Sequence, residues 1–215
     1  MTRAVIFDLW ETLVDYDAAG SRAFQDEVAR RLGRDPEEFA ALWFEGRAER
    51  ERGPLRDYVI GLGAEQVAVE ELVALRQDST RQMLRPRDGA VETLVELRRR
   101  GFRLGLISVC SEDVPDVWPE TPFADLFDST VFSCSVGLLK PDPRIYDLAC
   151  KELGVAPSEA IFVGDGANDE LAGAERAGLR AVLIHRAGEE PPWDEVRDWT
   201  GPRITAVPEL LALFG

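Results

Sequence analysis

The chain has 215 residues, which is enough for one well-buried domain or for a core domain carrying a smaller inserted one. Its formal net charge of −15 and pI of about 4.6 argue against nucleic acid as a partner, because phosphate backbones are bound by basic surfaces. No basic leader precedes an apolar stretch and no apolar run reaches membrane-spanning length, so we expect a cytoplasmic protein without a membrane partner.

The few cysteines and the single histidine narrow the chemistry further. Cys110, Cys134 and Cys150 are an odd number without metal-type spacing, and we expect them to be reduced thiols. His185 is the only histidine, which excludes a two-histidine metal site and leaves any Ser-His-Asp machinery dependent on this one residue. We therefore expect the chemistry to rest on carboxylates.

The chain opens with an apolar run at residues 4–7, Ala-Val-Ile-Phe, which predicts a strand buried on both faces. Asp8 follows directly, where this strand would leave its sheet. Asp8 could be a turn residue or a helix N-cap. Alternatively, it could face a ligand at the carboxyl edge of a parallel sheet. Later motifs decide between these two interpretations.

Residues 16–86 carry only helical patterns. Apolar residues recur at helical spacing in four stretches, near residues 24–32, 36–43, 55–62 and 69–83, and Gly or Pro separates or ends them. No strand signal occurs in this part of the chain. The pattern predicts an all-helical insert.

From residue 87 onward, strand and helix patterns alternate. Strands are predicted at 102–107, 130–132, 160–163 and 180–184, with a short sixth strand near Ile204 and helices between them. Such alternation predicts a parallel sheet with helices on both faces. The fold class is therefore α/β, with a Rossmann-like core formed by residues 1–15 and 87–215 and a helical insert at 16–86. Residues 188–192 are predicted to be an exposed loop.

Three of the predicted strands end in polar residues, namely Asp8, Ser108 and Asp165. Right-handed crossovers bring such ends to one edge of the sheet, where the side chains converge. Further acids follow Asp165, at Asp169 and Glu170. Carboxylates gathered there repel one another unless a divalent cation neutralises them, and oxygen-only ligands suit Mg²⁺. N-capping of the next helix would explain one of these acids but not the group.

Lys140 is one of only two lysines among 25 basic residues, and it lies between apolar residues and Pro141. A compact ammonium gives point-charge contact with a phosphate or carboxylate that a planar guanidinium does not reproduce. The alternative is an ordinary surface lysine.

These motifs, Asp8 to Thr12, then Ser108, then Lys140 before Pro141, then Gly164-Asp165, occur in the order found in the haloacid dehalogenase-like hydrolases. The chain resembles that superfamily over nearly its whole length. The insert at 16–86 looks like the family's small helical cap, which dehalogenases share with small-molecule phosphatases. The resemblance implies a hydrolase acting on a small molecule.

The resemblance also implies roles for individual residues. Asp8 is the expected nucleophile, which forms an aspartyl-phosphate if the substrate is a phosphate ester. Thr12 and Ser108 are expected to hydrogen-bond the transferring group, and Lys140 to stabilise its charge. The expected Mg²⁺ ligands are Asp8, the backbone carbonyl of Trp10, Asp165, and either Asp169 or Glu170.

The chain departs from the phosphatase pattern at Trp10. Phosphatases of the family have there an aspartate that protonates the leaving alcohol, and an indole cannot shuttle that proton. Glu11, where the family usually has glycine, is a carboxylate that could substitute. The preferred function is Mg²⁺-dependent hydrolysis of a small organic phosphate. The alternatives are a metal-independent 2-haloacid dehalogenase, whose halide leaves without a proton, and a weakly active binding protein.

The insert is expected to select the substrate. Trp43 and Arg47 are four residues apart and share a helix face, so Arg47 over the site could bind a substrate carboxylate or phosphate. The alternative is a solvated face on which arginines alternate with glutamates. Trp10, Glu11 and Arg47 are therefore candidates for shaping the pocket.

Overall fold

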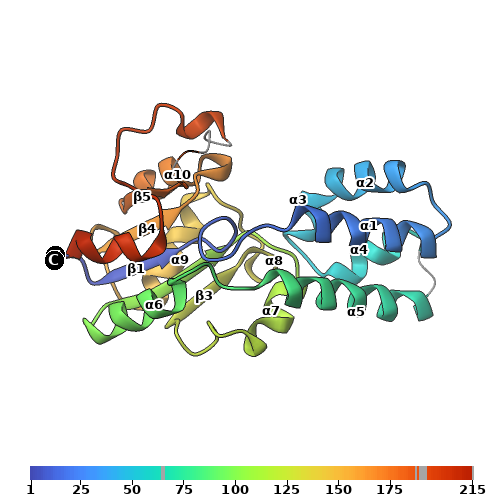
Figure 1. Ribbon diagram of the computed structural model, residues 1–215, viewed down its shortest axis with the longest axis horizontal. Helices are drawn as coiled ribbons and strands as arrows, with labels where there is room; N and C mark the ends of the chain where they lie inside the picture. Colours follow the sequence, from blue (N-terminus) through green and yellow to red (C-terminus); the bar gives the residue numbers. More distant parts are fainter. Residues whose placement is uncertain (64–65, 187, 189–192, 215) are drawn as a thin grey trace.

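In the computed structural model (Figure 1), which describes residues 1–63, 66–186, 188 and 193–214, six parallel strands form one sheet in the order β3-β2-β1-β4-β5-β6. Their bounds are β1 Ala4–Phe7, β2 Arg103–Ser108, β3 Ser129–Phe132, β4 Ala160–Gly164, β5 Arg180–Ile184 and β6 Arg203–Ile204. This confirms the predicted α/β class, including the short strand at Ile204.

Strand β1 lies in the middle of the sheet, and all four of its residues are fully buried. Phe7 is in register with Leu106 of β2 and with Val163 of β4. The amide of Asp8 continues the β1–β4 pairing by donating to the carbonyl of Val163 at 2.8 Å. Asp8 therefore leaves the sheet at its centre, between the ends of the two neighbouring strands.

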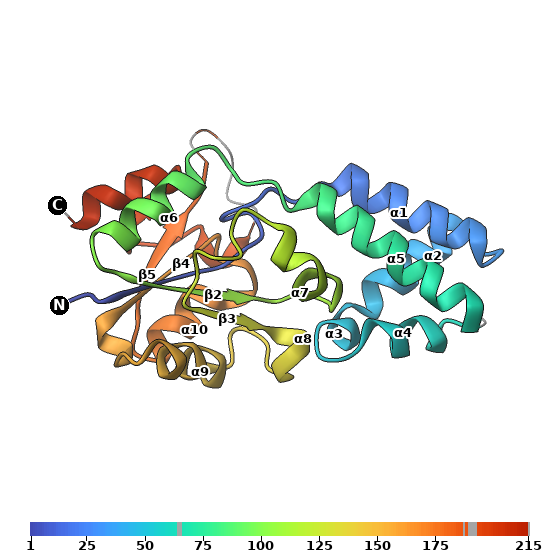
Figure 2. The ribbon, with the colours of Figure 1, turned by 90° about the horizontal axis from the view of Figure 1, so that it is seen from below.

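Helices cover both faces of the sheet (Figure 2). On one face, Phe7 packs in a hydrophobic cluster with Leu94 of α6 and Leu210 of η5. On the other, Ile6 packs with Ile145 of α9 and Leu171 of α10. The flanking elements are α6 Ala90–Arg99, α9 Pro143–Leu153, α10 Glu170–Arg176 and the 3₁₀ helix η5 Val207–Phe214. The last of these elements, after β6, is thus a 3₁₀ helix and not an α-helix.

Several short elements were not predicted, because segments of three to five residues carry too few positions for a period to show. They are α7 Asp113–Val117, α8 Ser133–Val136 and the 3₁₀ turns η1 Trp118–Glu120, η2 Pro157–Glu159, η3 Ala167–Asp169 and η4 Asp194–Val196. Of the predicted loop at 188–192, all but Gly188 lies outside the described residues.

Residues 16–86 contain the four predicted helices and one extra turn, and the described part of this segment has no strand. The helices are α1 Ala18–Arg31, α2 Pro36–Glu45, the short α3 Arg47–Arg50, α4 Leu55–Gly61 and α5 Gln66–Met83. They share a hydrophobic cluster of their own, centred on Phe39 and Trp43. Figures 1 and 2 show this helical segment beyond the end of the sheet toward which the strands point.

The helical segment contacts the rest of the chain mainly where its helix α5 packs against α7. Asp113 of α7 is fully buried, and its Oδ2 lies 3.0 Å from Nε of Arg76 and accepts a hydrogen bond from Thr80. The backbone amide of Leu55 donates to Glu112 at 3.0 Å. No helix within the described residues is long and apolar enough to cross a membrane.

Candidate active site

Three buried carboxylates meet where the central strands end. Asp8 follows β1, Asp165 follows β4, and Glu170 begins α10, and one oxygen of each lies within 4.8 Å of the others. We call these three residues the carboxylate cluster. Their proximity follows from the topology, because β1 and β4 are neighbours and only the short turn η3 separates β4 from α10.

Lys140 lies against this cluster. Its ammonium donates to Oδ1 of Asp8 and to Oε2 of Glu170, and its side chain is 5% exposed. Burial by itself would lower the pKa of Lys140, but the two carboxylates outweigh it and raise the pKa above its ordinary value. Burial also raises the pKa of Asp8 and of Glu170, while Lys140 opposes both shifts. Lys140 is therefore a buried lysine in contact with the carboxylate cluster and not a solvated one.

The charges of the cluster fit a divalent cation. Three carboxylates face one ammonium, which leaves two negative charges in excess in a buried site. Like charges held this close are unfavourable unless a cation compensates them. The donor set consists of carboxylate oxygens, which Mg²⁺ prefers.

Asp169 and Glu170 lie in different surroundings. Glu170 is 1% exposed, and its Oε1 accepts from the amide of Gly166 at 3.0 Å. Asp169 is turned outward, with a side chain that is 48% exposed and pairs with Arg176 at 3.1 Å. The reason is the backbone, since Asn168 and Asp169 both have positive φ, 52° and 60°. The structure thus brings Glu170, and not Asp169, to Asp8 and Asp165.

Thr12 and Ser108 are both fully buried. Within the described part of the chain, neither hydroxyl oxygen has a hydrogen-bond partner. Buried hydroxyls are normally paired, so an unused hydrogen-bond donor at each of these two positions is unusual. Neither residue lines the cavity described below, in contrast to Asp8 and Lys140.

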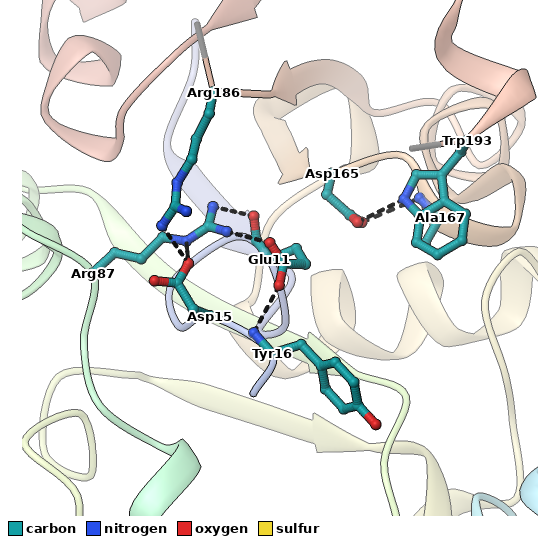
Figure 3. Close-up of polar contacts among 8 residues, drawn as sticks. All are labelled: Glu11, Asp15, Tyr16, Arg87, Asp165, Ala167, Arg186 and Trp193. Atoms are coloured by element: carbon teal, nitrogen blue, oxygen red, sulfur yellow. Dashed lines mark hydrogen bonds and ion pairs between the residues drawn. The ribbon is translucent and has the colours of Figure 1, made fainter. Parts of the chain in front are cut away.

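Glu11 takes part in an ion-pair network instead of remaining free (Figure 3). Its Oε2 lies 2.6 Å from Nη2 of Arg87, and its Oε1 accepts from the amide of Tyr16 at 2.7 Å. Arg87 also donates to the backbone carbonyl of Glu11. Both carboxylate oxygens of Glu11 thus accept hydrogen bonds from neighbouring donors, an arrangement that disfavours Glu11 as a donor to a leaving group.

The same network includes Asp15. Its Oδ1 lies 2.6 Å from Nε of Arg87 and 2.6 Å from Nη2 of Arg186 (Figure 3). Burial would raise the pKa of Asp15, but the hydrogen bonds from Arg186 and Arg87 lower it below 3.8. No sequence motif indicated Arg87 or Arg186, because their partners lie about seventy or more residues away along the chain.

Trp193 is, after Arg87 and Arg186, a third residue that the sequence did not indicate. Its indole Nε1 donates to Oδ2 of Asp165 at 2.8 Å, while the amide of Ala167 donates to Oδ1 at 3.1 Å (Figure 3). Both oxygens of Asp165 are therefore hydrogen-bonded, which fixes the orientation of this carboxylate in the cluster.

A cavity of about 600 Å³ extends from the carboxylate cluster to the helical segment. Asp8 and Lys140 line one part of it, and Trp43 and Arg50 line another. Trp10 and Glu11 also line it, as does Arg47, whose Nε lies 2.6 Å from Oε1 of Glu51. This volume is in the range of small-molecule sites.

The haloacid dehalogenase-like hydrolase family model matches residues 2–178. The chain therefore belongs to this family of hydrolases. It is 29% identical to the glyceraldehyde 3-phosphate phosphatase of Methanothermobacter thermautotrophicus, covering 99% of this chain and 98% of that protein. It is also 29% identical to (S)-2-haloacid dehalogenase 4A of Burkholderia cepacia, covering 89% and 87%.

Two further similarities agree with this membership. The match to the glyceraldehyde 3-phosphate phosphatase of Methanopyrus kandleri is 35% identical but spans only 59% of this chain and 55% of that protein. Among solved structures, a HAD phosphatase from Thermococcus onnurineus superposes with a TM-score of 0.74 at 24% identity, covering 100% of this chain and 98% of the other. This last similarity concerns the fold.

Proposed function

We propose that the protein is a Mg²⁺-dependent phosphatase that hydrolyses a small organic phosphate through an aspartyl-phosphate on Asp8. The observation that carries the proposal is the carboxylate cluster, whose two excess negative charges call for a divalent cation. Relatives named as phosphatases support the same reaction class.

In this proposal the Mg²⁺ ligands are Asp8, the backbone carbonyl of Trp10, Asp165 and Glu170. Bound Mg²⁺ would neutralise the cluster and polarise the phosphoryl oxygens. Glu170 is chosen as a Mg²⁺ ligand in place of Asp169 because it is buried beside Asp8, whereas Asp169 pairs with Arg176 at the surface.

Asp8 acts as the nucleophile. Its carboxylate oxygen bonds to phosphorus while the bond to the leaving alkoxide or phenolate breaks, and water then cleaves the acyl phosphate to release phosphate and restore Asp8. Lys140, which contacts Asp8, balances the charge of both carboxylate and phosphoryl group. The unpaired hydroxyls of Thr12 and Ser108 donate to phosphoryl oxygens.

The leaving group receives no proton from Trp10 or Glu11, the second and third residues after Asp8. The indole of Trp10 has no suitable proton, and the carboxylate of Glu11 is held by Arg87. Substrates whose leaving group departs as a stable anion are therefore favoured.

A second candidate is 2-haloacid dehalogenase chemistry, which the residue at position 10 favours because a departing halide needs no proton. The relative from Burkholderia cepacia carries that name. The third candidate is a binding protein with little turnover. We place the phosphatase first because the carboxylate cluster suits a metal ion, and halide displacement makes no use of a metal.

The helical segment at 16–86 is, in this proposal, a cap over a core formed by residues 1–15 and 87–215. Its separate hydrophobic cluster and the cavity between it and Asp8 support this division. We also propose a cytoplasmic location, on the basis of composition and the free thiols.

Turnover of phenyl phosphate and of an alkyl phosphate, each with and without Mg²⁺, tests the function. We expect Mg²⁺-dependent hydrolysis of the aryl ester, slower hydrolysis of the alkyl ester by a factor of about 10² or more, and no hydrolysis by Asp8→Asn. Hydrolysis of a 2-haloacid without Mg²⁺, and of neither phosphate, would instead establish the second candidate.

A further inference from the structure

Arg50, the last residue of α3, is a buried cation in the wall of the cavity. It is 6% exposed and lines the cavity. Its guanidinium carbon lies 3.9 Å from the ring centroid of Trp43 and 4.8 Å from that of Tyr58, and Nη1 donates to the backbone carbonyl of Trp43. These contacts hold the side chain in place and leave most of its five donors available.

The other two arginines of this cavity wall have counter-ions, whereas Arg50 has none among the residues that the structure describes. Arg47 pairs with Glu51 at 2.6 Å, and Arg76 pairs with the buried Asp113 at 3.0 Å. No carboxylate of the described residues lies within ion-pair distance of Arg50, which leaves one positive charge in excess. An uncompensated buried cation is costly, and burial lowers the pKa of Arg50 accordingly.

The cavity is therefore polarised along its length. Its core part gathers acids whose excess charge suits a cation and, with it, a phosphate. Its part in the helical segment carries one uncompensated positive charge, that of Arg50, among aromatic side chains that include Trp43 and Phe44. A ligand that matches both parts carries a phosphate at one end and one negative charge at the other.

We propose that Arg50 is a carboxylate-binding subsite, and that the substrate is a small phosphate ester with a carboxylate remote from its phosphate. This rests on the proposed phosphatase function and narrows its substrate class. One excess positive charge matches a monoanionic carboxylate better than a second, dianionic phosphate. The planar guanidinium suits a carboxylate, with which it can form two parallel hydrogen bonds.

The test compares kcat/KM for phenyl phosphate with that for 3- and 4-carboxyphenyl phosphate. The wild type is expected to prefer a carboxylated ester by about tenfold or more, the usual worth of a hydrogen bond to a charged group. Arg50→Met should abolish that preference by lowering kcat/KM for the carboxylated esters to the value for phenyl phosphate in the same variant. Arg50→Lys, which keeps the charge, should retain part of the preference.

Arg34→Met is the matched control. Arg34 also lies in the helical segment and donates to a backbone carbonyl, that of Leu62 at 2.7 Å, but it does not line the cavity. Its substitution should leave the carboxylate preference intact. A loss of preference equal to that of Arg50→Met would contradict the subsite.

Measurements of binding test the Arg50 subsite even if the protein does not hydrolyse phenyl phosphate. Dissociation constants of phenyl and carboxyphenyl phosphate are measured on Asp8→Asn with Mg²⁺, and the carboxylated ester should bind about tenfold more tightly. If phenyl phosphate is not hydrolysed by the wild type but this binding preference holds, the proposed function fails and the subsite stands. Equal affinities, or tighter binding of phenylene bisphosphate, overturn the carboxylate subsite even if Arg50→Met does not fold.

Discussion

Arg87 holds Glu11 by both its side chain and its backbone. Nη2 of Arg87 lies 2.6 Å from Oε2 of Glu11, and Nη1 donates to the carbonyl oxygen of the same residue. Glu11 has a φ of 55°, a left-handed conformation that is unfavourable for a side chain other than glycine. The ion pair therefore stabilises a strained loop that lies shortly after Asp8, the proposed nucleophile.

Arg87→Met should destabilise the protein by about 1–3 kcal/mol, because Glu11 and Asp15 both lose their ion pair with the largely buried guanidinium of Arg87. Urea unfolding measures this difference. The control is Arg98→Met, since Arg98 pairs with Asp128 at 3.0 Å on an exposed surface, where such pairs contribute about 0–1 kcal/mol. Equal losses in the two variants would contradict a special role for Arg87.

Glu11→Gln decides whether Glu11 protonates the leaving group. Because Arg87 and the amide of Tyr16 hold its carboxylate, we expect alkyl and aryl phosphate turnover to change by the same factor. A general acid would instead show a selective loss of alkyl phosphate turnover by a factor of about 10² to 10⁴. The ratio of the two kcat/KM values is the measurement.

Glu170→Gln and Asp169→Asn separate the two candidate metal ligands. In the wild type, Mg²⁺ at about 100 times its Kd should stabilise the folded state by about 2.7 kcal/mol. Glu170→Gln should remove most of this increase, which calorimetry records as a smaller shift in Tm. Asp169→Asn should keep it, since Asp169 pairs with Arg176 at the surface. The reverse pattern would assign the ligand to Asp169.

The lowered pKa of Asp15 predicts that the free energy of unfolding depends on pH. Hydrogen bonds from Arg186 and Arg87 lower its pKa in the folded state below 3.8, so its contribution is fully present above that value. The contribution is lost as the pH falls through the folded-state pKa. Asp15→Asn should therefore be less stable than the wild type at neutral pH, and the difference should vanish in acid. A difference in unfolding free energy that persists unchanged to low pH would contradict this assignment.

Much of the fold and site could be predicted from sequence because both depend on buried strands that end in polar residues. Residues 4–7 are apolar without interruption, and the next residue, Asp8, is the one that lies beside Lys140. The same pattern indicated Ser108 and Asp165. The long helices were predictable for a similar reason, since each spans enough turns for its apolar period to show.

What could not be predicted depends on long-range contacts and on backbone conformation. Trp193 reaches Asp165 from a distant loop, and no local pattern marks an indole for that contact. The choice between Asp169 and Glu170 depends on the left-handed residues Asn168 and Asp169, which turn one acid outward and the other inward. The uncompensated charge of Arg50 emerges only when the partners of its neighbours are known.

The proposed transfer of a phosphoryl group to Asp8 is tested most directly by trapping the intermediate. The protein is mixed with phenyl phosphate and Mg²⁺, quenched in acid, and analysed by intact mass and peptide mapping after borohydride reduction. Before reduction, we predict that the intact protein gains the mass of one phosphoryl group. Borohydride reduces the acyl phosphate and releases the phosphate, so after reduction we predict homoserine in place of Asp8 in its peptide, and neither change in Asp8→Asn. Turnover of phenyl phosphate with no phosphoryl group on Asp8, or with the label on another residue, would contradict the proposed mechanism.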